Sequence, residues 1–319
     1  MEGPSPWESA SLASKATFMV NPCPWSRLCR QWRVQSGEGS YKLVQLANGV
    51  HSLHSLEYGE TFHPVIGPVA EAEALYVRQL RLLERLQKHT GEFVVWDVGL
   101  GAAANAVTML RAAKEVDCSL RVISFDQTKE PLQFALEHRE SLQYLAGYED
   151  CIGGLLRDGE VRFGNGLARV AWELHVADFP SLIRTPDVDK LSKPHAIMFD
   201  AFSPAKNPAM WTEPLFARLF SLLEPSRPCA LPTYSRSTML RVTLLLAGFF
   251  VGAGHATGEK EETTIAANTL GLIDEPLRRG WLERVRRSTS AEPLWEAVYR
   301  QAPLSPETWD RLRQHQQFV

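Results

Sequence analysis

A glycine-rich turn and three strand-ending acids are the residues in this sequence whose types and spacing suit chemistry. The turn follows an apolar run at residues 93–98 and contains Gly99 and Gly101, after which a helical pattern begins. Glycine lets the backbone turn sharply and approach a ligand closely, and the start of a helix offers free N–H groups. A turn of this kind between strand and helix can hold NAD, FAD or S-adenosylmethionine.

Three features of the region favour S-adenosylmethionine among these cofactors. The third glycine of the dinucleotide fingerprint is absent, because Ala104 stands in its place. Asp126 ends the second strand, where an acid can accept both ribose hydroxyls. Asp178 follows the third strand, where an acid can meet the adenine amino group. Either acid alone is as well explained as a solvated loop residue, whereas the three elements in this order indicate a nucleoside-type cofactor.

The third acid, Asp200, ends a strand at residues 195–199, next to the crevice expected where the strand order reverses. Phe202 and Pro204 supply apolar walls beside it, and Pro208 joins Pro204 in fixing the loop. Side chains on such a loop are held in place, as a reacting centre requires. Asp200 is therefore the candidate catalytic residue.

The rest of the sequence supplies the elements that must position these residues. Between residues 93 and 267, short apolar strands alternate with helical segments. This pattern predicts an α/β fold with a doubly wound, mainly parallel, Rossmann-like sheet. A strand at residues 263–267 closes the sheet as an antiparallel hairpin, and helices are expected at residues 69–89 and 131–145. The glycine-rich residues 147–166 interrupt the alternation, so we expect an insertion loop there and only a short strand at 174–176.

Outside this core, the sequence predicts an extension at each end. Asn48-Gly49 between two strand-like runs predicts a small antiparallel β extension, and the polar, arginine-rich residues from 274 onward predict an appendage. The 319 residues are enough for one large α/β domain with such additions. We expect a tail with the β extension at residues 1–66, a cofactor-binding core at 67–270 and a C-terminal appendage at 271–319.

The composition argues against several classes of protein. The formal net charge of −3 disfavours nonspecific coating of nucleic acid, although a local basic patch can still hold an RNA backbone. Apolar runs are too short to span a bilayer, and the N-terminus lacks the pattern of a signal peptide. The five cysteines are scattered without a Cys-x-x-Cys pair. We expect reduced thiols, no metal site, no membrane association and a cytoplasmic location.

The stretch from Asp200 to Trp211, Asp-Ala-Phe-Ser-Pro-Ala-Lys-Asn-Pro-Ala-Met-Trp, resembles the Asp-Gly-Phe-x-Pro-x-Lys-Asn-Pro-x-Met-Trp motif of the MnmC-like methyltransferase family. The turn from Gly99 to Asn105 resembles that family's Gly-Phe-Gly-Thr-Gly-Leu-Asn loop, and the likeness extends over roughly residues 58–268. We expect a stand-alone methyltransferase without the FAD-dependent oxidase domain of the bifunctional members. Two family glycines are replaced in this chain, by Ala103 and Ala201.

The resemblance implies a class I methyltransferase that uses S-adenosyl-L-methionine and acts on the anticodon loop of tRNA. The implied reaction converts 5-aminomethyl-2-thiouridine to 5-methylaminomethyl-2-thiouridine, after separate oxidase or GTPase-type enzymes have modified the uridine upstream. In this reaction Asp200 orients the neutral amine for in-line attack on the sulfonium methyl and stabilises the charge that grows on nitrogen. The implied cofactor-binding residues are Glu71, Gly99, Gly101, Asn105, Asp126 and Asp178, and the implied substrate-binding residues are Tyr58, Phe202, Pro204 and Lys206.

Two arginine-rich segments are candidates for RNA contact. Residues 278–287 hold five arginines and Trp281, and residues 25–33 mix three arginines with two tryptophans. Basic residues mixed with aromatics suit phosphates and unstacked bases, although a solvated amphipathic helix is the simpler explanation for either segment by itself. Residues 58–63 are expected to form a lid, in which His63 is structural rather than catalytic.

Three other functions stay open on the residues alone. A methyl- or aminopropyl-transferase acting on a small amine has a similar core and an acid at the same strand end. The missing third glycine argues against a nicotinamide-dependent oxidoreductase. Asp200 beside a cofactor turn argues against a non-catalytic protein that kept the fold. The sequence leaves the oligomeric state open.

Overall fold

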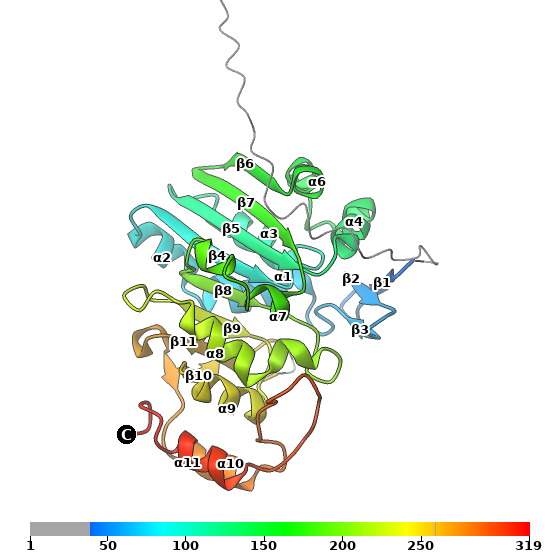
Figure 1. Cartoon of the computed structure of the whole chain (residues 1–319). Coiled ribbons are helices and arrows are strands. Elements are labelled where there is room, and N and C mark those ends of the chain that lie inside the picture. Colours follow the sequence, from blue (N-terminus) through cyan, green and yellow to red (C-terminus); the bar gives the residue numbers. More distant parts are fainter. Residues whose placement is uncertain (1–38, 259) are drawn as a thin grey trace, which may run out of the picture. The chain divides into compact units, whose positions relative to one another are not determined.

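The architecture comes from a computed structural model, which describes residues 39–258 and 260–319 (Figure 1). Its centre is a nine-stranded sheet with the order β12-β10-β11-β9-β8-β4-β5-β7-β6. In that order the strands are β12 (Glu275–Pro276), β10 (Phe250–Gly254), β11 (Thr263–Ala267), β9 (Ala230–Thr233), β8 (Ala196–Phe199), β4 (Glu92–Val98), β5 (Ser119–Asp126), β7 (Ala168–Val176) and β6 (Glu160–Asn165).

The strand order reverses at β4. This strand pairs in parallel with β5 on one side and with β8 on the other, so that Val98 lies level with both Phe125 and Phe199. Parallel pairing continues to β7 beyond β5 and to β9 beyond β8. The carboxyl ends of β4, β5 and β8 therefore meet at a switch point, which is where folds of this type bind ligands. The predicted doubly wound, Rossmann-like α/β sheet is confirmed.

Antiparallel strands close one side of the sheet. β11 pairs antiparallel with both β9 and β10, as the sequence predicts. The short β12 adds to β10, with Pro276 opposite Gly252. A strand from the segment predicted to be an appendage thus extends the sheet itself, while the boundaries 67–270 and 271–319 stay predictions.

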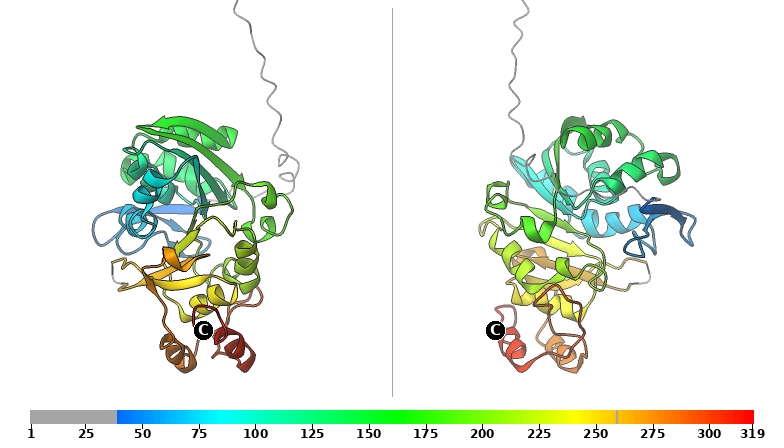
Figure 2. Two further views of the ribbon diagram at one scale, coloured as in Figure 1. Left: turned by 90° about the vertical axis from the view of Figure 1, so that its left-hand side faces the viewer. Right: turned by 45° about the vertical axis from the view of Figure 1, so that its right-hand side comes forward.

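Helices cover both faces of the sheet (Figure 2). α3 packs with α1, α2 and the π-helix η2, whereas α8 packs with α9, which also contacts α11. No helix within the described residues is both long and apolar enough to cross a membrane. The helical elements are α1 (Pro68–Ala72), η2 (Glu73–Arg78), α2 (Leu82–Lys88), α3 (Ala104–Ala113), α4 (Glu130–Glu137), α5 (Arg139–Leu142), α6 (Glu149–Asp158), α7 (Phe179–Leu182), η3 (Val188–Lys190), η4 (Pro208–Trp211), α8 (Glu213–Ser221), α9 (Thr238–Leu246), η5 (Leu270–Leu272), α10 (Trp281–Arg287) and α11 (Pro306–Leu312).

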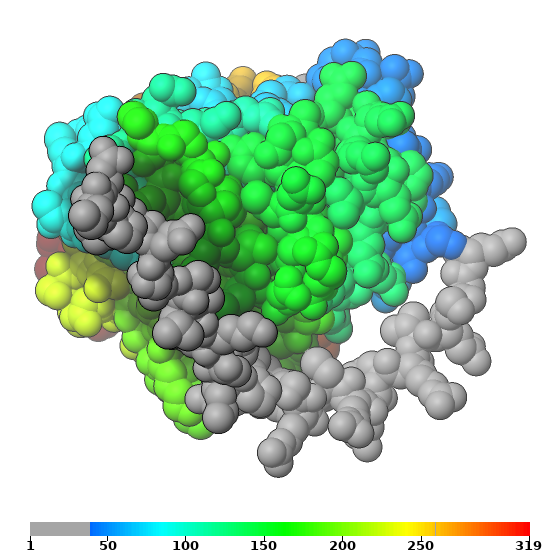
Figure 3. Space-filling model, turned by 90° about the horizontal axis from the view of Figure 1, so that it is seen from above, coloured from blue at the N-terminus to red at the C-terminus, as the bar shows by residue number. Residues whose placement is uncertain are grey.

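A separate three-stranded sheet of β1 (Tyr41–Gln45), β2 (His51–Ser55) and β3 (Glu60–Thr61) precedes the core. β1 and β2 form the predicted antiparallel hairpin, and Gly49 in its turn has φ 83°, a value that favours glycine. The ring of Tyr41 lies 6.3 Å from that of Phe134 in α4. This contact sets the blue surface of the small sheet beside the green surface of the core in Figure 3.

The predicted insertion loop at residues 147–166 is wrong. Most of it forms α6 and the edge strand β6, which pairs antiparallel with β7. The glycines that suggest a loop serve close packing instead, since a Cβ on Gly154 would lie 2.6 Å from Cγ1 of Val161 in β6. β7 in turn spans nine residues rather than the three predicted. Along β6, Glu160, Arg162 and Gly164 are exposed, whereas Val161 and Phe163 at the alternate positions are partly buried.

Two predicted helices are interrupted. The helix expected at residues 69–89 becomes α1, η2 and α2, because Arg81 takes a left-handed conformation with φ 48°. The helix expected at residues 131–145 becomes α4 and α5, separated by His138, which leaves helical geometry at φ −107° and ψ 23°. Both breaks lie where no proline or glycine marks them, so periodicity alone runs through them.

Candidate active site

The tips of β4 and β8 touch at Gly99. Its φ is 90°, and a Cβ added there would lie 2.6 Å from the backbone oxygen of Asp200. The backbone N–H groups of Gly99 and Leu100 both donate to the carbonyl of Phe125, at the end of β5. Glycine is therefore required at residue 99 for the three strand ends to converge.

Replacing Gly99 by alanine is expected to destabilise the fold and to displace the Asp200 tip. Gly91→Ala is the matched control, because Gly91 has φ 96° but no atom within 4 Å of an added Cβ. Both variants bear the left-handed strain of about 1–2 kcal/mol, and Gly99→Ala bears a further ~1–3 kcal/mol of overpacking. Denaturant unfolding of the two variants measures the difference, and equal losses would show that the close approach at residue 99 has no energetic consequence.

The turn after Gly99 is braced by Asp126. Its Oδ2 accepts the N–H of Gly101 at 2.8 Å, and its Oδ1 accepts the N–H of Thr128 at 3.2 Å. Burial raises the pKa of Asp126, while these backbone hydrogen bonds lower it. Each carboxylate oxygen keeps a further lone pair, so the acid can still accept hydroxyl donors beside the turn.

Ala103, at one of the two replaced family glycines, precedes α3 in a left-handed conformation with φ 61° and ψ 17°. Alanine in this conformation costs about 1 kcal/mol that glycine would not. The other replacement needs no such conformation, because Ala201 does not have a positive φ. Its carbonyl accepts the hydroxyl of Tyr234 at 3.0 Å.

A chain of polar side chains joins three parts of the sequence beside this turn. Asn105, in the first turn of α3, donates through Nδ2 to Oδ2 of Asp200 at 2.7 Å. Nε2 of His63 lies 3.6 Å from the same oxygen, and Nδ1 of His63 lies 3.3 Å from Oε1 of Glu71 in α1. Oδ1 of Asn105 is buried and has no hydrogen-bond partner among the described residues.

His63, Glu71 and Asp200 influence one another's pKa values. Burial by itself would lower the pKa of His63, but Asp200 and Glu71 together raise it above the ordinary value. Burial would raise the pKa of Glu71, yet the hydrogen bond and charge of His63 lower it. Burial raises the pKa of Asp200, against the lowering effects of His63 and Asn105. The raised pKa of His63 and the lowered pKa of Glu71 favour an imidazolium–carboxylate pair, whereas burial acts against the charged form of Asp200.

His63 belongs to this site, although the sequence predicts only a structural role for it. Its side chain is 8% exposed and lies between the candidate catalytic acid and a candidate cofactor ligand. Its φ of 47° is uncommon for histidine and turns the chain from β3 toward α1. No local pattern in the sequence signals this placement.

Aromatic side chains pack together on the loop that follows Asp200. Tyr58 stacks on Phe202 with ring centroids 4.1 Å apart, and Phe62 meets Phe202 edge-on at 5.4 Å. The loop is pinned from both sides, since the backbone N–H of Ser203 donates to Glu60 at 3.0 Å and Nε1 of Trp211 donates to the carbonyl of Phe202 at 2.7 Å. Residues 58–63 thus contact the loop after Asp200, and their role as a lid stays a prediction.

The remaining predicted site residues lie farther out. Asp178 is exposed and caps α7, where its Oδ2 accepts the N–H of Ser181 at 3.1 Å. Lys206 is exposed, and its Nζ lies 3.8 Å from the Cβ position of Gly59. Pro204 is partly buried in the same loop. The arginines of residues 25–33 lie outside the described residues.

The arginines of α10 are partly engaged within the protein. Arg284 lies 3.7 Å from Glu262, and Arg286 lies over the ring of Trp309 at 5.3 Å. These contacts agree with an amphipathic helix at least as well as with an RNA-binding surface. In the described part of the chain, His, Cys, Asp and Glu do not form a group of three or more that could hold a metal ion.

The residues at the turn fit a nucleoside-type cofactor. A Cβ on Gly101 would lie 2.9 Å from the ring of Phe62, so this ring lies directly on the turn. The unpartnered Oδ1 of Asn105 and the carboxylates of Glu71 and Asp200 can face cationic groups. The expected cofactor, S-adenosyl-L-methionine, has two of these, an ammonium and a sulfonium.

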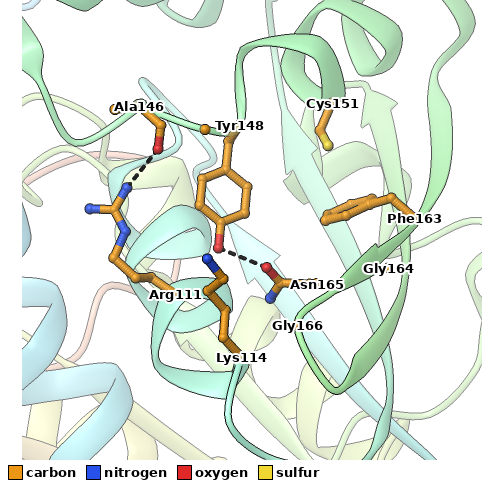
Figure 4. A pocket seen from close by; sticks show the side chains of 10 residues that line it. Arg111, Lys114, Ala146, Tyr148, Cys151, Phe163, Gly164, Asn165 and Gly166 are labelled. Carbon is orange, nitrogen blue, oxygen red and sulfur yellow. Dashed lines mark hydrogen bonds between the residues drawn. The ribbon is translucent and has the colours of Figure 1, made fainter.

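Two hollows lie elsewhere on the protein. One of about 280 Å³ lies at the far end of α3, where Tyr148 points to Asn165 and Arg111 to the carbonyl of Ala146 (Figure 4). The other, of about 370 Å³, is bordered by Gln79 and four acids of residues 261–275. Neither contains Gly101 or Asp200.

Comparison with known proteins adds independent information. A family model described as S-adenosyl-L-methionine-dependent methyltransferase matches residues 157–269. The bifunctional protein MnmC for tRNA 5-methylaminomethyl-2-thiouridine biosynthesis is 30% identical in Ectopseudomonas mendocina (strain ymp), over 65% of this chain and 32% of that protein. The protein of the same description in Pseudomonas putida (strain GB-1) is 30% identical over 67% of this chain and 33% of its own length. The chain thus spans about a third of the length of the curated relatives it matches.

A solved structure shares the fold. MnmC2 from Aquifex aeolicus superposes with a TM-score of 0.62 and 23% identity, covering 87% of this chain and 85% of that one. At this identity the likeness concerns the fold, which is the class I methyltransferase architecture described above.

Proposed function

Because the chain belongs to the MnmC-like family of S-adenosyl-L-methionine-dependent methyltransferases, we propose that it methylates the primary amine of 5-aminomethyl-2-thiouridine at the wobble position of tRNA. The observation that carries this proposal is the Asp200 carboxylate, held by Asn105 at 2.7 Å beside the glycine turn. The family's methyl donor supplies an electrophilic methyl group on a sulfonium, so that the protein must supply an oriented nucleophile. The product is 5-methylaminomethyl-2-thiouridine.

Asp200 is the residue that we assign to the reacting amine. A fixed carboxylate accepts a hydrogen bond from the amine, orients its lone pair and stabilises the positive charge that grows on nitrogen. Asn105 holds one oxygen of this carboxylate, which leaves Oδ1 for the amine. The side chain is only 14% exposed, so water weakens this interaction little.

The cofactor side of the site is assigned to six residues. Glu71 and the unpartnered Oδ1 of Asn105 accept hydrogen bonds from the ammonium of the donor's methionine part. Gly99 and Gly101 let the backbone of the turn approach the donor closely. Asp126 accepts the ribose hydroxyls with the lone pairs that its backbone contacts leave. Asp178 is assigned to the adenine amino group, although in the structure its exposed carboxylate caps α7.

The substrate side is assigned to the aromatic loop. Phe202 and Pro204 hold the flat base. Tyr58 stacks on Phe202 in the structure, so its ring either moves aside for the base or covers it. Lys206 is exposed next to this pair and suits a phosphate of the anticodon loop. The wobble base is unpaired, so turning it into the site costs little. Enzymes of the oxidase or GTPase type would act first to build the aminomethyl group, and the setting is the cytoplasm.

The experiment is methyl transfer from radiolabelled S-adenosyl-L-methionine to purified acceptors. We expect label in tRNA isolated from cells that lack this methylation step, found as 5-methylaminomethyl-2-thiouridine by mass spectrometry of its nucleosides. Fully modified tRNA is the control and takes up no label. Label in spermidine or putrescine but not in tRNA would replace the proposal by a small-amine transferase.

A further inference from the structure

We propose that His63 is a positioning residue that keeps the Glu71 and Asp200 carboxylates in place before the methyl donor binds, and that it gives up a proton on binding. The inference rests on the proposed function, because it assigns those two acids to the donor's ammonium and to the reacting amine. It goes further in naming the residue that neutralises both acids beforehand and the proton that leaves.

The first support is geometric. The imidazole uses one nitrogen toward each acid, with Nδ1 3.3 Å from Glu71 and Nε2 3.6 Å from Asp200. All three side chains are at most 14% exposed. Two buried carboxylates without a cation between them would repel each other and be costly to desolvate, and the imidazolium of His63 supplies that positive charge.

The second support is the way in which the backbone presents His63. The preceding residue, Phe62, is tied to β2, since its N–H donates to the carbonyl of Leu53 at 2.8 Å and its carbonyl accepts the hydroxyl of Ser52. Phe62 also lies on Gly101, at 2.9 Å from its Cβ position. The φ of 47° at His63 then directs the ring between the acids rather than along the strand. This arrangement locates the imidazole at the junction of the donor and acceptor sides.

The third support is the charge balance around the ring. The groups that influence this cluster are the neutral phenols of Tyr76 in η2 and of Tyr234, which follows β9, and the buried Asp97 in β4. Lys260, whose Nζ lies over the ring of Tyr234, lowers the pKa of both Glu71 and Asp200. Before the donor binds, His63 and Lys260 therefore balance the two carboxylates.

Donor binding changes this balance. S-adenosyl-L-methionine brings a sulfonium and an ammonium into the same space, and each cation disfavours the protonated ring. The proton affinity of His63 therefore falls on binding, and the proton leaves to solvent. By linkage, donor affinity rises with pH as long as the free protein is protonated at His63, and becomes independent of pH above that range.

The test is isothermal titration calorimetry of S-adenosyl-L-methionine into the full chain at pH 7, in buffers of different ionisation enthalpy. The slope of observed enthalpy against buffer enthalpy counts the protons exchanged. We expect net proton release for the wild type and close to none for His63→Gln. S-adenosyl-L-homocysteine, which lacks the sulfonium charge, should release less. His54→Gln is the matched control, because His54 contacts Thr61 at 2.8 Å and neither acid.

Each outcome decides the matter. Equal proton release by the wild type and His63→Gln, or no release by either, overturns the assignment of the proton to His63. A structural role alone would change the affinity of His63→Gln but not its proton count. The donor titration needs no methyl acceptor, so failure to methylate tRNA with normal proton release would reject the proposed substrate and leave this inference standing. Circular dichroism confirms that each variant is folded before titration.

Discussion

Asp200→Asn is expected to slow methyl transfer by about 100- to 1,000-fold, the effect of removing one preorganised electrostatic contact to a developing charge. The substitution keeps the shape of the side chain but removes its charge. If the amide oxygen of the new asparagine keeps the hydrogen bond from Nδ2 of Asn105, which is 2.7 Å long in the wild type, the amide NH2 group faces the substrate amine in place of a carboxylate oxygen. The amine is then neither aligned nor stabilised as positive charge grows on its nitrogen.

Single-turnover methyl transfer and donor titration separate the two parts of this prediction. The rate should fall while the dissociation constant of S-adenosyl-L-methionine changes by less than about tenfold, because other residues hold the donor. Asp310→Asn is the control, since Asp310 forms an exposed pair with Arg313 on α11, outside the site. A rate within threefold of wild type would remove Asp200 from the chemistry.

Asp97→Asn is expected to stabilise the protein at neutral and alkaline pH. Asp97 lies in β4 at 1% exposure, and burial raises its pKa to about 7. Its Oδ2 accepts the hydroxyl of Ser124 at 2.8 Å, and that hydroxyl oxygen accepts Nε1 of Trp172 at 2.9 Å. Oδ1 has no partner among the described residues, so the ionised form is poorly compensated.

The sign of the pH dependence follows from these pKa values. Between the ordinary pKa of 3.8 and about 7, the unfolded chain releases the proton of Asp97 and the folded chain retains it. The free energy of unfolding therefore falls as pH rises through this range, by about 4 kcal/mol at most, and the loss is complete above pH 7. Asparagine cannot ionise, so the variant escapes the loss.

Urea unfolding at several pH values checks this prediction. The variant should match wild type near pH 4, exceed it increasingly up to about pH 7 and keep a constant advantage above that pH. Asp117→Asn, which removes an exposed carboxylate paired with Arg169, should follow the wild-type profile throughout. Parallel profiles for Asp97→Asn and wild type would falsify the raised pKa.

Much of the fold follows from local sequence. The glycine turn and the acids of residues 126 and 200 each adjoin an apolar strand, and strands of a doubly wound sheet bring their carboxyl ends to one edge. That rule places Gly99 against Asp200 although a hundred residues separate them. Turn chemistry likewise predicts the first hairpin, because Gly49 has the positive φ that Asn-Gly pairs favour.

Other features depend on tertiary contacts that no local pattern carries. The link from Glu71 through His63 to Asp200 joins a loop, a helix and a strand end, so its members show no common spacing. α6 was missed because two adjacent glycines indicate a loop, whereas in the structure Gly154 allows the helix to lie against Val161. The same tertiary contact extends the sheet by one strand, β6, beyond what periodicity indicates.

That extra strand bears on how copies of this chain meet in solution. β6 is the last strand on its side, and it turns the unlike charges of Glu160 and Arg162 outward at alternate positions. A neighbouring molecule that joined its own strand here would have to strip water from those ionic groups. The β6 edge therefore disfavours strand pairing between molecules, and we expect concentrated protein not to polymerise through β6.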